Sequence, residues 1–82
     1  MKRMNELKEG EKGLISKNLA NESMKRRFLD LGLIDNTVVE CVGRSPFGDP
    51  SAYLIRGAIY AIRADDCADI YIEPLEERDA TL

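Results

Sequence analysis

Short, nearly continuous apolar runs bounded by Gly, Pro, Asn and Asp recur along this chain, and that pattern predicts strands rather than long helices. The clearest strand is the TVVECV segment, in which β-branched residues dominate. Five short strands are expected, over residues 11–16, 37–42, 52–56, 59–63 and 70–73. Gly57 divides the third from the fourth, so these two should form a hairpin. Pro74 is expected to stop the last strand.

One helix is expected between the first two strands. Asn21 is suited to cap its first turn, and Gly32 to end it in the left-handed conformation, with Leu33 packing back on the last turn. The apolar positions recur at helical spacing: Met24, Phe28 and Leu31, with Leu29 widening the stripe. A helix of about three turns should therefore bury Phe28 against the sheet.

The remaining segments are expected to form turns. Residues 4–10 should make a short turn with Leu7 inward, and residues 64–67 one helical or 3₁₀ turn. Five strands in an open sheet would leave edges exposed to edge-to-edge pairing. We therefore expect a mainly β fold, a small closed barrel with the helix packed at one end or side.

Composition indicates one small globular domain. The chain has 82 residues, a length that leaves no room for a second core. Of these residues, 44% are hydrophobic and 33% are charged, as in an ordinary globular protein. We expect a single domain over residues 1–82, with its core in 4–74 and a polar, frayed tail over 75–82. No apolar run approaches the roughly 20 residues that span a bilayer, and the N-terminal segment lacks the apolar stretch of a signal peptide. A cytoplasmic protein without membrane insertion is expected.

Charge is distributed unevenly along the chain. Residues 1–27 carry eight Lys and Arg against four Glu, whereas residues 64–82 carry one Arg against seven acids. Neither end is basic enough to indicate a nucleic-acid-binding protein. Two interpretations remain: the chain binds a partner protein that has patches of both signs, or these charges form a well-solvated surface.

The residues offer little for catalysis or metal binding. The chain has no histidine, and Cys41 and Cys67 are expected to be small buried hydrophobes rather than metal ligands. Asp65, Asp66 and Asp69 could form a cation site, but a solvated acidic turn explains them better. The PFGDP segment lacks the Lys and the following helix of a phosphate-binding loop. We therefore expect no enzyme, no cofactor and no tight metal site within the chain.

The PFGDP segment is the most unusual stretch. Pro46 and Pro50 restrict the backbone, and Gly48-Asp49 favours a turn, so a rigid loop should carry Phe47 at its tip. Two hypotheses follow for Phe47: the side chain caps an open end of the barrel, or it is presented to a partner.

Two segments, MKRRFLDLGLIDNTVVE (24–40) and SPFGDPSAYLIRGAIYAIRADDCADIYIE (45–73), resemble the FeoA family. The similarity covers roughly residues 4–74 and includes a basic helix ending in Leu-Gly-Leu, the Pro-Phe-Gly-Asp-Pro loop, a hairpin, and Ala61-Ile62-Arg63 before a short turn. One departure is Asp35-Asn36, where the family usually has Pro-Gly; Asn tolerates the left-handed region, so the turn should survive.

The resemblance implies an SH3-like barrel and a small cytoplasmic accessory protein of ferrous iron uptake. Such a protein would bind the cytoplasmic G-protein part of the transporter FeoB and modulate transport or GTPase activity. The alternative is a regulatory, metal-sensing domain akin to the C-terminal module of DtxR-type iron-dependent repressors. Whether the chain forms a homo-oligomer is left open by the sequence. Candidate contact residues are Lys25, Arg26 and the loop Pro46, Phe47, Gly48, Asp49 and Pro50, while Phe28, Leu31, Gly32, Leu33 and Gly57 are assigned structural roles.

Overall fold

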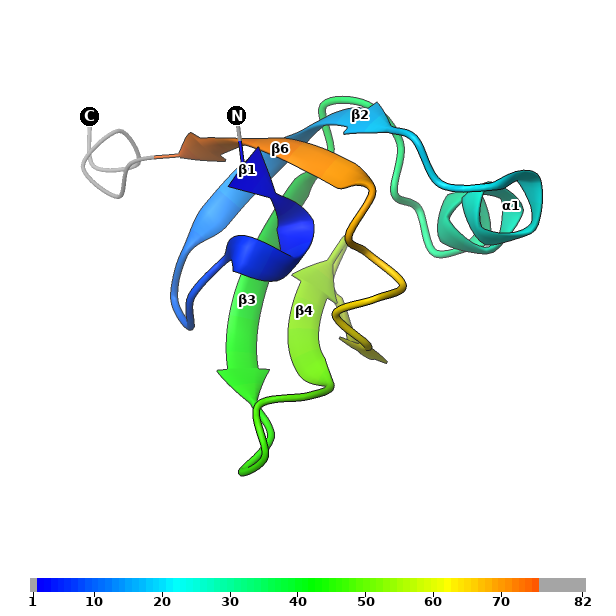
Figure 1. Cartoon of the computed structure of the whole chain (residues 1–82). Helices are drawn as coiled ribbons and strands as arrows, with labels where there is room; N and C mark the ends of the chain where they lie inside the picture. Colours follow the sequence, from blue (N-terminus) through cyan, green and yellow to red (C-terminus); the bar gives the residue numbers. More distant parts are fainter. Residues whose placement is uncertain (1, 76–82) are drawn as a thin grey trace.

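The computed structural model describes residues 2–75, and in this range the chain folds into six strands, one α-helix and one short 3₁₀ helix (Figure 1). In chain order the elements are β1 (Lys2–Arg3), η1 (Met4–Glu6), β2 (Lys12–Asn18), α1 (Glu22–Asp30), β3 (Val38–Arg44), β4 (Ser51–Ile55), β5 (Ala58–Ile62) and β6 (Ile70–Leu75). The predicted mainly β fold with one inserted helix is confirmed.

All strands belong to one antiparallel sheet with the order β1-β6-β2-β3-β4-β5. β2 and β6 cross the molecule above β3 and β4, which run down it, so the sheet is strongly curled (Figure 1). Register shifts in β2, between Ile15 and Lys17, and in β3, between Cys41 and Gly43, bend these strands. β1 and β5 lie at the ends of the order and do not pair within residues 2–75. The expected closure of the barrel is therefore wrong: the curl encloses a core, but both edges stay open.

The core fills the inside of the curl. Its largest fully buried side chains come from every part of the described chain: Tyr53, Phe28, Met4, Leu7, Ile15, Leu33, Ile55, Ile70, Ile72, Val39, Cys41 and Cys67. Leu7 is fully buried, as predicted, because η1 turns the N-terminal segment inward beneath β6. Both cysteines are buried free thiols, also as predicted.

Helix α1 has the predicted caps at both ends. The Asn21 Oδ1 accepts the Met24 N–H at 2.9 Å. At the other end, the Leu33 N–H donates to the Phe28 carbonyl at 2.9 Å and the Gly32 N–H to the Leu29 carbonyl at 3.0 Å, with φ of Gly32 at +92°. This pair of bonds satisfies the last carbonyls of the helix. Local sequence thus fixes both ends of α1.

One side of α1 packs on the core. Phe28 is 1% exposed and is surrounded by core residues, while Met24 and Leu31 are partly buried against them. Leu29 does not widen the apolar stripe as expected, since it is 55% exposed. It follows Phe28 by one residue and is therefore rotated by about 100° around the helix axis.

The hairpin forms at the predicted place. Arg56 and Gly57 make the two-residue turn, and both have positive φ, at 49° and 85°. This is the backbone of a type I′ turn, whose twist matches that of the paired strands. Asn36, in the turn where the FeoA pattern departs, also has a positive φ of 69°, so that turn survives the exchange.

Two local expectations need correction. β1 was not expected, and β6 runs through Pro74 to Leu75 instead of stopping before it. The proline is tolerated because β1 reaches only as far as Ile72, which leaves β6 open on that side at Pro74. The single turn expected over residues 64–67 is present, because the Asp66 and Cys67 N–H groups both donate to the Arg63 carbonyl, and hydrogen-bonded turns continue to residue 69. The tail expected over 75–82 lies, beyond Leu75, outside the described residues.

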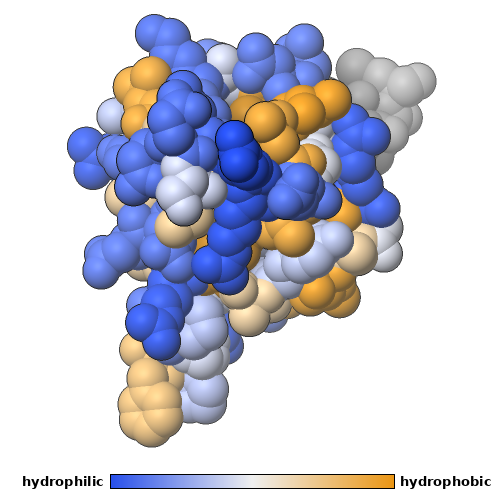
Figure 2. Space-filling model, turned by 90° about the vertical axis from the view of Figure 1, so that its right-hand side faces the viewer, coloured by the Kyte–Doolittle hydropathy of each residue, from blue (hydrophilic) through white to orange (hydrophobic). Residues whose placement is uncertain are grey.

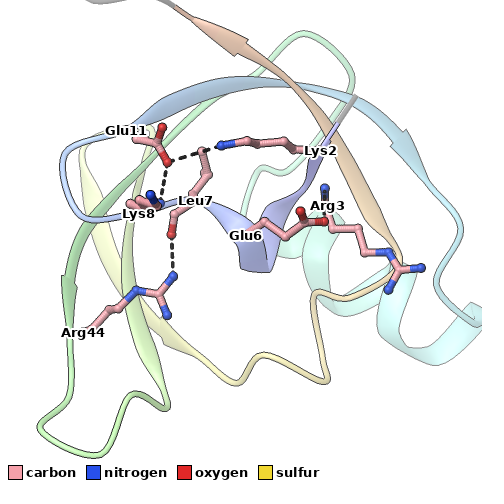
Figure 3. A network of polar contacts seen from close by, with 7 residues as sticks. All are labelled: Lys2, Arg3, Glu6, Leu7, Lys8, Glu11 and Arg44. Carbon is pink, nitrogen blue, oxygen red and sulfur yellow. Dashed lines mark hydrogen bonds and ion pairs between the residues drawn. The ribbon is translucent and has the colours of Figure 1, made fainter.

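Polar contacts hold the N-terminal segment against the sheet (Figure 3). Arg44 donates from Nη2 to the Leu7 carbonyl at 2.7 Å. Glu11 accepts the Lys8 N–H at 2.7 Å and pairs with the Lys2 Nζ at 3.6 Å. These contacts keep Lys2 and Arg3 beside β6, where β1 forms one end of the sheet.

Candidate partner-binding surface

The loop between β3 and β4 is built as a rigid projection at the bottom of the molecule (Figure 1). The Gly48 N–H donates to the Ser45 carbonyl at 2.8 Å, and the Ser45 Oγ donates to the Asp49 carbonyl at 2.8 Å. The Asp49 Oδ1 also accepts the Ala64 N–H at 2.8 Å, which ties the loop to the turn after β5. The loop is therefore ordered before any partner binds.

Phe47 stands at the tip of this loop and is 95% exposed. The hypothesis that it caps an open end of the barrel is wrong, because the core is complete without it. An exposed aromatic ring on a pre-ordered loop loses little entropy when it is buried by a partner. The geometry thus leaves presentation to a partner as the remaining hypothesis for Phe47.

Lys25 and Arg26 lie on α1, apart from Phe47. Arg26 is exposed, whereas Lys25 is half-buried and lines a groove of about 650 Å³ beside the segment that leads into the helix. The groove also contains three exposed apolar side chains, none of which was expected to be a contact residue: Leu19, Leu29 and Ile34. In Figure 2, which faces the α1 side, hydrophilic residues cover much of the surface and apolar ones emerge between them. The candidate contact residues therefore lie in two separate regions of the surface, the β3–β4 loop and α1.

Pro50, the last residue of the loop, lies on the side of the loop that faces α1. It lines a second groove, of about 500 Å³, together with residues of α1, β5 and the following turn: Met24, Arg27, Phe28, Leu31, Tyr60, Ala61, Ile62, Arg63 and Asp66. Sequence reasoning missed this groove, since the helix and β5 are far apart in the chain. The one feature of the sequence that could have indicated a binding groove here is the lack of charged residues in β5.

The Cys67 thiol is unsuited to nucleophilic chemistry at neutral pH. Burial raises the pKa of Cys67 to about 11, and its Sγ lies 3.9 Å from the Tyr53 hydroxyl. Burial likewise raises the pKa of Tyr53 above the usual range of a phenol. Both side chains are therefore neutral core residues, in agreement with the expectation for Cys67.

The acidic turn does not assemble into a metal centre. Within residues 2–75, no group of three or more His, Cys, Asp or Glu side chains could hold a metal ion. Asp65 and Asp69 are exposed, and Asp66 lines the groove with Arg63. The absence of a tight metal site stays a prediction.

The fold is that of an SH3-like domain, a small curled sheet with an inserted helix. A model of the FeoA domain matches residues 2–74. The chain therefore belongs to the FeoA domain family, which is associated with ferrous iron transport. No curated protein matches the sequence significantly.

Solved structures agree with this assignment. An FeoA-like protein from Clostridium acetobutylicum is 28% identical, with a TM-score of 0.84, over 93% of this chain and 88% of its own. The FeoA of Stenotrophomonas maltophilia, an SH3 domain protein solved with zinc, is 21% identical, with a TM-score of 0.75, over 89% of this chain and 91% of its own.

The expected relation to repressors is also seen. A manganese-dependent transcriptional repressor shares the fold with a TM-score of 0.82, at 17% identity, over 90% of this chain and 41% of its own. No helix among the described residues is long and apolar enough to cross a membrane.

Proposed function

We propose that this chain is a small, non-enzymatic accessory protein of ferrous iron uptake. It acts in the cytoplasm, binds the cytoplasmic G-protein part of the transporter FeoB, and modulates transport or GTPase activity. The match of the FeoA domain to residues 2–74 carries this proposal. The Stenotrophomonas relative is itself described as a candidate activating factor of ferrous iron transport.

The surface supports a binding role rather than catalysis. Phe47 is 95% exposed, and aromatic side chains contribute much of the binding energy of small interfaces. Three hydrogen bonds around Ser45, Gly48 and Asp49 order the loop before binding. We assign Pro46 to Pro50 as the primary contact, with Lys25 and Arg26 as a second contact.

The alternative is a metal-sensing domain like the module at the end of repressors. The structural likeness to the manganese-dependent repressor favours this alternative only at the level of fold, because identity is 17%. The accessory role is better supported, since the family match covers most of this chain.

The test is a pull-down of the FeoB cytoplasmic domain on the immobilised protein, with guanosine diphosphate, with a non-hydrolysable triphosphate analogue, and without nucleotide. We expect capture that depends on the nucleotide and is lost in Phe47→Ser. The matched control, Phe47→Leu, should still bind because it keeps a large apolar side chain. Both variants should melt within a few degrees of the parent, because an exposed side chain contributes little to stability.

Two results would contradict the proposal in different ways. If the parent protein captures no FeoB domain in any nucleotide state, the assigned partner is wrong. If Phe47→Ser binds as well as the parent, the partner is right but the loop is not the contact. Charge reversal at Lys25 and Arg26 would then be examined.

A further inference from the structure

β5 ends the sheet with a free hydrogen-bonding edge. The two-residue turn makes Ile55 and Ala58 a hydrogen-bonded pair, and such pairs alternate along the antiparallel ladder. Ile59 and Ala61 consequently direct their N–H and C=O groups away from β4. Within residues 2–75, no hydrogen bond or strand pairing uses these outward groups. Four backbone groups are therefore available to an incoming strand.

The composition of β5 leaves this edge unprotected. Proteins commonly guard an exposed edge with charged residues, proline or a very short strand. The β5 sequence AIYAI has no charge and no proline over its five residues, and Ile59 is 65% exposed. An unguarded edge of this length is a liability unless it has a partner.

The groove of about 500 Å³ runs along this same edge. Three consecutive β5 residues line it, Tyr60, Ala61 and Ile62, although their side chains alternate between the two faces of the sheet. A groove lined by all three reaches the free backbone edge of β5 at residues 60–62. α1 and its C-cap residue form the opposite wall through Met24 and Leu31, with Phe28 buried at its base. The space thus has the form of a slot between a strand and a helix.

The charges of the slot favour an acidic occupant. Arg27 and Arg63 line it from opposite sides, and neither makes an ion pair or a side-chain hydrogen bond within the described chain. Asp66 is the one acidic residue among those lining the slot. Two unpaired guanidinium groups against one carboxylate leave a positive excess, and arginine binds carboxylates with two parallel hydrogen bonds.

We propose that the slot between β5 and α1 binds an extended, acidic segment of a partner protein, which adds to the sheet as a strand beside β5. Ala61, which lines the slot, and Ile59, which continues the same edge just beyond it, supply the backbone hydrogen bonds, and Arg27 and Arg63 select carboxylate side chains. This mode of binding does not rest on the identity of the partner, so it can be tested without the transporter.

The probe is a displayed library of short random peptides, selected on the intact protein. Peptides rich in Asp and Glu should be enriched. Ala61→Pro removes the outward N–H and leaves the bonds between β4 and β5 in place, so it should weaken the selected peptides at least about tenfold. The matched control Ala61→Ser keeps the N–H and should bind as the parent does. Arg27→Glu combined with Arg63→Glu should weaken the same peptides by a similar factor.

Amide hydrogen exchange provides a test that needs no variant. In the free protein, the Ile59 and Ala61 amides should exchange rapidly, and the selected peptide should protect both. Failure to enrich any peptide, an enriched set without acidic residues, or peptides that leave these two amides unprotected would each overturn the proposal. Equal binding to a folded Ala61→Pro variant would do so as well.

Discussion

The two ends of the sheet are built differently. β1 has two residues, Lys2 and Arg3, both positively charged, and Glu11 fixes Lys2 at 3.6 Å. β5 has five uncharged residues and faces a slot of about 500 Å³. The first edge is too short and too charged to pair with another strand, whereas the second offers a continuous template. An open sheet of this size can thus protect one edge and use the other.

This difference places the β3–β4 loop and the proposed slot on the same side of the molecule. Pro50 belongs to both the exposed loop and the slot beside β5, and Asp49 joins that loop to the turn after β5. The closed barrel expected from the strand count would have removed both edges and, with them, the slot.

The largest effect is expected from Phe28→Ala, which removes the anchor of the helix that walls the β5 slot. Truncating a buried phenylalanine costs about 3–5 kcal/mol of unfolding free energy. Phe28 is 1% exposed, and domains commonly have only about 5–15 kcal/mol in total. Urea unfolding followed by circular dichroism measures the loss.

Leu29→Ala is the matched control, since Leu29 is the next residue on the same helix and is 55% exposed. It should change stability by no more than about 0.5 kcal/mol. Equal losses in the two variants would show that α1 is not anchored on the core. The slot would then have no fixed wall, and the contrast between the two edges would fail.

An intermediate loss of stability is expected from Gly32→Ala. The added methyl group would push the Arg56 side chain of the β4–β5 hairpin away from the end of α1. Gly32 has a φ of +92°, and a Cβ there would lie 2.7 Å from the Arg56 Cδ. Arg56 also donates from Nε to the Gly32 carbonyl at 3.1 Å. The left-handed backbone alone costs about 1–2 kcal/mol for a residue with a Cβ, and the displaced Arg56 adds to this.

Gly10→Ala isolates the backbone cost in the same unfolding experiment. Gly10 has a φ of +91°, and a Cβ there would meet nothing within 4 Å. The excess loss in Gly32→Ala over Gly10→Ala should disappear when Arg56→Ala is added. If the excess persists, Arg56 does not couple the hairpin to the helix end.

The locally determined features were predictable from the sequence. The caps of α1 depend on Asn21 and Gly32, and the hairpin depends on Gly57, each acting on residues a few positions away. The features that failed depend on neighbours distant in the chain. β6 could pass through Pro74 only because β1 is too short to reach that residue, and the length of β1 is set by a pairing across the whole chain.

The candidate site was predictable only in part. The prolines indicated an ordered loop, yet the exposure of Phe47 depends on whether other side chains complete the core, and this became visible only in the fold. The slot beside β5 joins Arg27 of the helix to Arg63 after the last hairpin strand. No spacing in the sequence relates these two residues, so pattern analysis could not bring them together.

The smallest effect is expected at the β1 edge, from Glu11→Gln. A hydrogen bond from the Lys8 N–H and, secondarily, the positive charge of Lys2 hold the pKa of the Glu11 carboxyl below its usual value. A carboxyl whose pKa is lowered on folding stabilises the fold above its unfolded-state pKa and loses that contribution as the pH falls through the folded-state pKa. The melting temperatures of the parent and Glu11→Gln should therefore differ slightly at neutral pH and converge on acidification. Added salt should weaken the contribution of the Lys2 charge to this difference and leave the Lys8 hydrogen bond in place. The variant Lys2→Met removes the Lys2 contribution alone. A difference that grows as the pH falls would show that the β1 edge is not held by this carboxylate.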